Sequence, residues 1–202
     1  MIDTPQLSRS DRTGMYLYAV LSLAGIVAVV AWVVSRLVEV ASARSIPVLV
    51  PFTGETAPLP IGPGGSAVDV SVDRAVIDVA DPAPATLFAI WAQPVVVGLT
   101  LIALIAIAGL FCLRLARGRA FRRGTARLMY TGAGVIAVGW VLGSILSNMT
   151  VNGALAAVSD RSYDGVVFES NLTPVFAILV LTAVATAFQI GERLQRETEG
   201  LV

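Results

Sequence analysis

Arg114-Leu-Ala-Arg-Gly-Arg-Ala-Phe-Arg-Arg-Gly-Thr-Ala-Arg127 decides how this chain is arranged. The stretch holds six arginines and no acidic residue, and a long uncharged apolar run borders it on each side. Arginines this close to hydrocarbon stay on the cytoplasmic side of a membrane. The stretch, which we call the arginine turn, therefore predicts a multi-pass membrane protein and fixes the direction of its spans.

Four apolar runs without a charged residue are present in the chain, which is 56% hydrophobic and only 14% charged. About 20 apolar residues, rising about 1.5 Å each, cross a hydrocarbon core of roughly 30 Å. The predicted fold is therefore an all-α membrane protein with four transmembrane helices and a small irregular or β-rich outer loop region. The predicted order is a cytoplasmic segment (1–14), a span (15–35), an extracytoplasmic proline-rich loop with short strands (36–86), a span (87–113), the arginine turn (114–127), a span (128–147), an extracytoplasmic loop (148–172), a span (173–190) and a cytoplasmic helical tail (191–202).

The two outer loops are acidic, as this topology requires. Residues 35–85 carry three arginines, six acids and seven of the ten prolines, and residues 147–171 carry one arginine and three acids. The alternation in Val68–Val72 and the run Val76–Val79 predict one or two short strands, which could form a hairpin, in an otherwise irregular cap. Both termini are expected in the cytoplasm. All fourteen basic residues are arginine, a bias that suggests a bacterial inner-membrane protein.

The first apolar run has a second interpretation, a cleaved signal peptide with a cleavage site at Ala41-Ser42-Ala43. Its uncharged stretch exceeds the roughly 7–15 residues of a signal-peptide core, which favours a retained span.

Catalytic chemistry finds little support in the sequence. The chain has no histidine, which removes the commonest general base and metal ligand, and its single cysteine, Cys112, cannot form an internal disulfide. The aspartates at 69, 73, 78 and 81 do not have the spacing of an EF-hand loop. We therefore predict a non-enzymatic protein with no cofactor and no metal site, and we expect no direct binding to nucleic acid.

Small residues recur every four positions on two of the predicted helices. One row is Gly139, Gly143 and Ser147, and the other is Ala183, Ala187 and Gly191. Such rows let helix backbones approach closely in lipid. Packing within the chain is the first interpretation, and homodimerisation through the glycine row is the second.

The arginine turn and the acidic tail form the candidate contact surface. Beyond setting topology, juxtamembrane arginines attract anionic lipid headgroups, by about 1 kcal/mol each near the surface. They could also pair with a protein or with the tail on the same side of the membrane. The predicted contact residues for lipid or a partner are Arg114, Arg117, Arg119, Arg122, Arg123, Arg127, Glu192, Glu197 and Glu199.

Two short motifs resemble those of a bacterial four-span family of unknown function, DUF twenty-nine seventy-five. The first is Leu115–Gly124, with Gly118 and Phe121. The second lies in the tail and consists of Phe188, Gly191, Leu194 and Glu197. The resemblance covers essentially the whole chain, although the proline-rich outer loop is longer than in the simplest members. It implies no established activity, but small helix-turn-helix regulators encoded beside some members suggest a cytoplasmic regulatory protein as partner.

The predicted function is that of a tether or regulator that engages a cytoplasmic partner or anionic membrane lipid. The first alternative is a small transporter or channel component. It is disfavoured because the spans contain no ionisable residue, the usual mark of an ion path. The second alternative is a ligand sensor that uses the outer loop.

Overall fold

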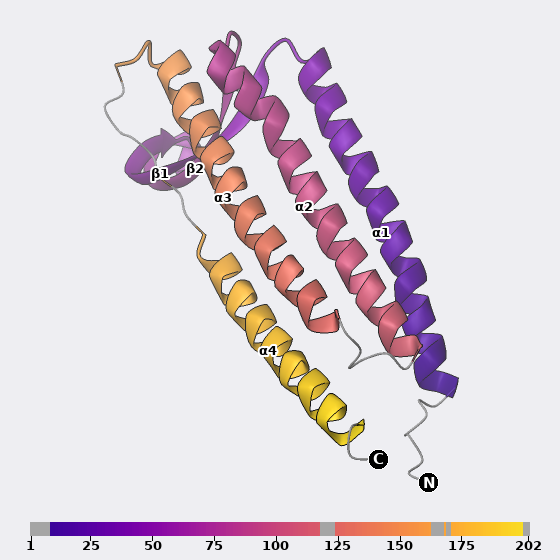
Figure 1. The fold of residues 1–202 in the computed structure, drawn as a ribbon. Helices are drawn as coiled ribbons and strands as arrows, with labels where there is room; N and C mark the ends of the chain where they lie inside the picture. Colours follow the sequence, from indigo (N-terminus) through magenta and orange to yellow (C-terminus); the bar gives the residue numbers. More distant parts are fainter. Residues whose placement is uncertain (1–8, 118–123, 163–167, 169–170, 200–202) are drawn as a thin grey trace. The chain divides into compact units, whose positions relative to one another are not determined.

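Within the residues that the structure describes, the chain forms four long helices and one two-stranded antiparallel sheet (Figure 1). The structure is a computed structural model and describes residues 9–117, 124–162, 168 and 171–199. The elements are α1 (Arg9–Ser42), β1 (Ile46–Leu59), the short 3-10 helix η1 (Pro63–Gly65), β2 (Val68–Val79), α2 (Pro84–Ala116), α3 (Thr125–Val158) and α4 (Thr173–Glu199).

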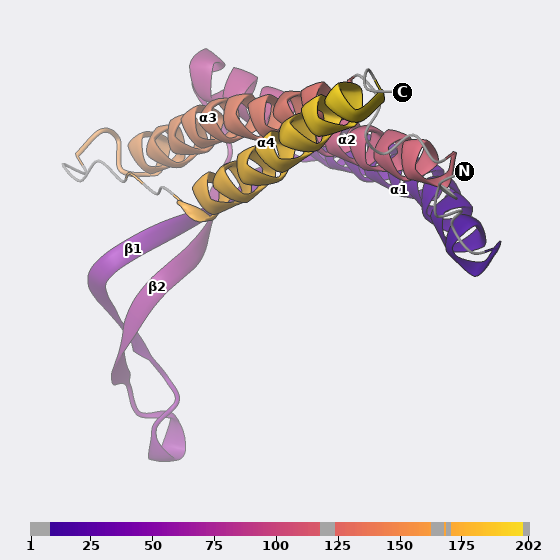
Figure 2. The same cartoon turned by 60° about the horizontal axis from the view of Figure 1, so that its bottom comes forward.

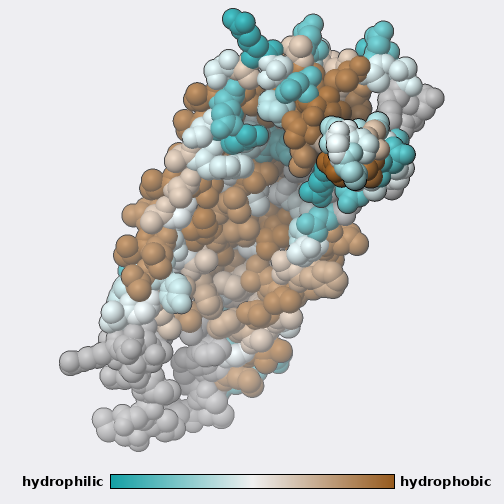
Figure 3. All heavy atoms as spheres, turned by 180° about the vertical axis from the view of Figure 1, so that it is seen from behind, coloured by the Kyte–Doolittle hydropathy of each residue, from teal (hydrophilic) through white to brown (hydrophobic). Residues whose placement is uncertain are grey.

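All four helices are long and apolar enough, by length and composition, to cross a membrane, and they include the four apolar runs that the sequence predicted as spans. The qualifying segments are Thr13–Ser42, Pro84–Ala116, Thr125–Val158 and Thr173–Leu194. Large apolar side chains stay exposed along them, such as Leu23 at 65% and Val138 at 60%. Figure 3 shows hydrophobic side chains covering the helices on the face that it draws. An exposed surface of this kind suits hydrocarbon better than water.

Helices α1, α2 and α3 extend further than the predicted spans. Helix α1 runs from Arg9 to Ser42, so the predicted loop 36–86 is wrong over its first seven residues. Helix α3 continues to Val158, so the predicted loop 148–172 is wrong over its first eleven residues. The polar residues there do not end the helix because their side chains bond within it. The Asn148 Nδ2 atom donates to the Ser144 carbonyl at 2.8 Å, and Asn152 Nδ2 donates to the Asn148 carbonyl at 2.9 Å. Helix α2 begins at Pro84 rather than 87, since proline is well suited to the first turn of a helix.

The chain divides into two compact units. The helical unit contains Met1–Arg36, Pro94–Leu142 and Asn171–Val202, and the hairpin unit contains Leu37–Gln93 and Gly143–Ser170. In the helical unit, α1 packs on α2, with Gly25 facing Ile105 and Gly109 facing Ser22. Helices α2, α3 and α4 meet at Gly132 of α3, which faces both Ile107 of α2 and Leu181 of α4.

Residues 46–79 form a hairpin, one of the predicted arrangements, but its strands are longer and more regular than the sequence predicted. Strands β1 and β2 pair from Ile46↔Val79 to Leu59↔Val68, with a register shift between Pro51 and Glu55 (Figure 2). Prolines do not prevent this strand because β1 is an edge strand, where a residue without an N–H group is tolerated. The shift at residues 51–55 is a β-bulge, a feature that bends and twists the ribbon.

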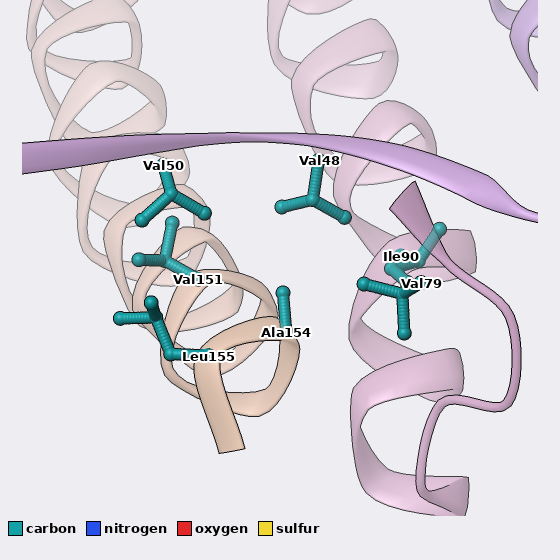
Figure 4. Close-up of a cluster of buried hydrophobic side chains, with 7 residues drawn as sticks. All are labelled: Val48, Val50, Val79, Ile90, Val151, Ala154 and Leu155. Carbon is teal, nitrogen blue, oxygen red and sulfur yellow. The ribbon is translucent and has the colours of Figure 1, made fainter. Parts of the chain in front are cut away.

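The base of the hairpin is anchored by an apolar cluster. The clustered side chains come from both strands, α2 and α3, and Figure 4 shows Val48 and Val50 pointing from β1 toward the α3 side chains. Val50 is fully buried. The cluster consists of Val48, Val50, Val79, Ile90, Val151, Ala154 and Leu155.

Candidate functional site: the turn end of the helical unit

The candidate site is the end of the helical unit where α2 stops and α3 starts. We define this turn end as Arg114–Arg117, Gly124–Tyr130 and Phe188–Glu197. It contains three of the six predicted arginines, half-buried Arg114 and exposed Arg117 and Arg127. The other three, Arg119, Arg122 and Arg123, lie outside the described residues, as do the motif positions Gly118 and Phe121.

Arg114 has a buried polar atom without a partner. Its Nη1 atom is inaccessible to solvent and makes no hydrogen bond to any part of the chain that the structure describes. The guanidinium lies against Gly124, where a Cβ atom would be 3.5 Å from Nη1. Gly124 has φ +100, a conformation that glycine adopts without steric cost. A guanidinium carries five N–H donors and no acceptor, so the unused donor can be satisfied only by an acceptor oxygen.

A second unsatisfied polar atom lies at the first residue of α3. The Thr125 side chain is fully buried, and its Oγ1 atom has no hydrogen-bond partner among the described residues. Most buried polar groups in folded proteins are hydrogen-bonded, and an unpaired one costs about 1–3 kcal/mol. The turn end therefore contains two polar groups, Arg114 Nη1 and Thr125 Oγ1, that the described part of the chain leaves unsatisfied.

Glu192 occupies the N-terminus of α3 from the neighbouring helix. Its Oε1 atom accepts the N–H of Ala126 at 3.3 Å, and its side chain is only 9% exposed. The first N–H groups of a helix have no partner within the helix, and the helix dipole favours a negative charge there. Turn and tail are thus in contact, through the Glu192 carboxylate and the backbone amide of Ala126. Glu192 is directed into the protein rather than toward a partner.

Two further contacts hold α4 against α2 and α3 at this end. The Tyr130 hydroxyl lies 3.0 Å from Thr186 Oγ1 and donates to Gln189 Oε1 at 3.4 Å. Phe111 and Phe188 form an edge-to-face pair with ring centroids 5.6 Å apart. Phe188 was singled out in the sequence as part of a motif, and here its ring supplies packing between α2 and α4.

The rest of the tail is exposed. Arg193 Nε donates to Glu197 Oε1 at 2.9 Å, with side-chain exposures of 78% and 59%. An exposed pair of this kind contributes little stability. Leu194 is also exposed, and α4 continues to Glu199, in agreement with the predicted helical tail. Of the other predicted contact residues in the tail, Glu197 is the one whose side chain is described, and it faces solvent.

The two rows of small residues have different surroundings. Gly139 packs within the chain, because a Cβ atom there would overlap Thr100 of α2. Gly143 has nothing within 4 Å of the position that a Cβ would take, and Ser147 is half-buried. On α4, Ala183 and Ala187 are exposed and Gly191 is half-buried. The buried face of α4 instead contains Ala185 and Glu192, the two residues of this helix with the least exposure.

Several hydroxyl groups inside the helices are directed to their own backbones. In the helical unit, Ser22, Thr100, Thr131 and Thr182 each donate to the carbonyl four residues earlier. No group of three or more cysteine, aspartate or glutamate side chains that could hold a metal occurs among the described residues.

Sequence reasoning missed Thr125, Tyr130 and Phe111 as residues of this site. Thr125 had a usable signal, since threonine often begins a helix and a glycine precedes it here. The partners of Tyr130 and Phe111 lie more than fifty residues away along the chain, and no local pattern indicates such contacts. Comparison with protein-family models, curated proteins and solved structures gives no match for this chain.

Proposed function

We propose that this chain is a non-enzymatic membrane protein whose turn end binds the headgroup of an anionic phospholipid and presents a surface for a cytoplasmic protein. In this proposal the turn end and both termini face the cytoplasm of a bacterial cell, and the protein acts as a tether or regulator. The observation that carries it is the group of three described arginines at this end, of which Arg117 and Arg127 are exposed and Arg114 is half-buried. A phosphate oxygen is an acceptor that a guanidinium binds with matched geometry.

The surroundings of Arg114 support an anionic ligand at the same place. Arg117 and Arg127 are exposed near the ends of α2 and α3, so their charges stay free to attract a headgroup. Glu192 already takes the Ala126 amide, so we assign the lipid to the arginines rather than to the N-terminus of α3.

We prefer this proposal to transport because the span hydroxyls bond to carbonyls of their own helices. They are therefore not presented to an ion path. The relationship to DUF twenty-nine seventy-five remains part of the proposal, as does the regulatory partner that it suggests.

The first experiment measures lipid retention. The full chain is placed in nanodiscs that contain equal parts of phosphatidylcholine and phosphatidylglycerol, then released and examined by native mass spectrometry. We expect preferential retention of phosphatidylglycerol. Arg114→Gln should lower that retention roughly fivefold, since a juxtamembrane arginine contributes about 1 kcal/mol.

Arg193→Gln is the matched control, because Arg193 is exposed at the same end and already pairs with Glu197. It should retain phosphatidylglycerol as the unmodified chain does. Equal retention of both lipids by the unmodified chain would overturn the headgroup proposal. For the tether, a photo-crosslinking residue at Arg117 in intact cells should capture a cytoplasmic protein, and recovery of lipid alone would remove that role.

A further inference from the structure

An open groove lies on the surface of the helical unit, between α2 and α3. No side chain of the described residues fills it. Its volume is about 550 Å³. Thr131, Gly134, Val138 and Leu142 line it from α3, and Leu99 and Thr100 line it from α2. The two helices touch beneath it, where Gly139 packs against Thr100, so the groove has a closed floor.

The groove offers only hydrocarbon to an occupant. Its two hydroxyls are already used, since Thr100 Oγ1 donates to the Val96 carbonyl at 2.8 Å and Thr131 Oγ1 donates to the Arg127 carbonyl at 2.9 Å. Gly134 has nothing within 4 Å of a notional Cβ atom, which leaves room at the middle of the groove. Apart from the acceptor lone pairs of these two hydroxyl oxygens, the lining offers no side-chain polar group to an occupant, so the groove fits an aliphatic chain.

The charge lies at one end of the groove only. Arg127, Thr131, Gly134 and Val138 follow each other at helical spacing and therefore share one face of α3. Arg127 is exposed one turn before the groove begins, and Arg114 and Arg117 belong to the same turn end. A ligand that follows this face meets a cation first and apolar side chains after it.

The length of the groove distinguishes a lipid from a second copy of the chain. Thr131 to Leu142 spans about 16 Å at about 1.5 Å per residue, which is close to half of a hydrocarbon core of roughly 30 Å. A transmembrane helix from a second copy would continue past this groove into the other leaflet. An acyl chain occupies one leaflet and is anchored by its headgroup at the interface.

We propose that this groove holds one acyl chain of an anionic phospholipid whose phosphate contacts Arg127. The inference rests on the proposed function and deepens it by naming the chain-binding half of the lipid site. Arg127 contacts the headgroup directly, and Gly134 provides the space that the chain occupies.

The test uses a phosphatidylglycerol probe with a photoreactive diazirine on one acyl chain, together with the corresponding phosphatidylcholine probe. The full chain is reconstituted in vesicles, irradiated, digested and examined for labelled peptides. We expect the phosphatidylglycerol probe to label residues 131–142 of α3 and 96–100 of α2. Gly134→Leu should fill the groove and lower this labelling roughly fivefold, a change of about 1 kcal/mol.

Gly143→Leu is the matched control, because Gly143 lies on the same helix, has equally open space and does not line the groove. It should leave the labelling unchanged. Arg127→Gln should remove the preference for phosphatidylglycerol over phosphatidylcholine at these residues. Retention of native fold in each variant is checked by thermal unfolding in detergent.

The outcomes separate this inference from the proposed function. One outcome would overturn the groove and leave the headgroup site intact. In it, Gly134→Leu does not lower the labelling, while Arg114→Gln still lowers phosphatidylglycerol retention. Labelling of the groove by both probes equally, with no preference in the nanodisc experiment, would overturn both. Crosslinks between two chains through residues 131–142, in place of lipid adducts, would assign the groove to a second copy and refute the lipid.

Discussion

The base of the hairpin and the turn end are held by opposite kinds of contact, apolar at the base and polar at the turn end. At the base, seven apolar side chains from β1, β2, α2 and α3 bury one another. At the turn end, the buried groups include a carboxylate on a backbone amide, a guanidinium nitrogen without a partner and a threonine hydroxyl without a partner. The cluster at the base contains only apolar side chains, although Thr150 beside it on α3 has a buried hydroxyl without a partner among the described residues. The turn end leaves two polar groups that the described residues do not satisfy.

This difference separates stability from recognition. Apolar burial contributes about 25 cal/mol per Å² and needs no particular ligand. An unsatisfied buried polar group lowers stability unless a ligand supplies its partner, so it is retained only where such a ligand is bound or where water reaches it. We therefore expect substitutions at the base to change folding, and substitutions at the turn end to change binding together with smaller effects on folding.

The largest effect is expected at the base of the hairpin. Val50→Asp places a carboxylate at a position with 0% exposure, among side chains that offer no charge partner. A buried charge without compensation costs on the order of 3–5 kcal/mol. Thermal unfolding in detergent, followed by tryptophan fluorescence, should show a large loss of stability or failure to fold.

Val76→Asp is the control, because Val76 is on the same hairpin and is 63% exposed. It should unfold at the temperature of the unmodified chain within error. Equal losses in the two variants would contradict the assignment of the base as an apolar anchor.

A smaller effect is expected at the junction of α3 and α4. Glu192→Ala removes the carboxylate that accepts the Ala126 N–H. Loss of a charged hydrogen bond at a helix N-terminus should lower the free energy of unfolding by about 1–2 kcal/mol. Glu197→Ala, which breaks only an exposed pair, should cost less than about 0.5 kcal/mol. Chemical denaturation of both variants in one detergent measures the difference, and equal costs would show that Glu192 does not cap α3.

The four long apolar helices were predictable because their signal is local and strong. Each apolar run is read from consecutive residues, and the four helices contain the predicted spans. The ends were less predictable, since the extension of α3 through Asn148 and Asn152 depends on side chains that bond within the helix. The long hairpin was also underestimated, because the prolines of β1 suggested irregular structure, although an edge strand tolerates them.

The candidate site was predictable in composition but not in arrangement. The arginines and Glu192 were chosen from charge alone, as contacts for lipid, for a partner or between turn and tail, and the structure directs Glu192 to the Ala126 amide. Likewise, Gly139 and Gly143 look equivalent in the sequence. Only Gly139 meets a neighbouring helix, because Thr100 of α2 lies opposite it. Such distinctions depend on which helix faces which, and four apolar helices of similar composition do not encode that locally.

The smallest effect is expected at Tyr130, whose hydroxyl at the turn end already has hydrogen-bond partners within the chain. Tyr130→Phe removes the hydroxyl that joins α3 to Thr186 and Gln189 of α4 and keeps the ring. Hydrogen bonds between membrane helices contribute about 0.6 kcal/mol on average, so we expect a loss of this size in chemical denaturation. Tyr18→Phe is the control, since Tyr18 is 63% exposed on α1.

Lipid retention should not change in Tyr130→Phe, because this hydroxyl already has its partners within the chain. A loss of phosphatidylglycerol in this variant would mean that the whole turn end, and not its unsatisfied groups, determines binding.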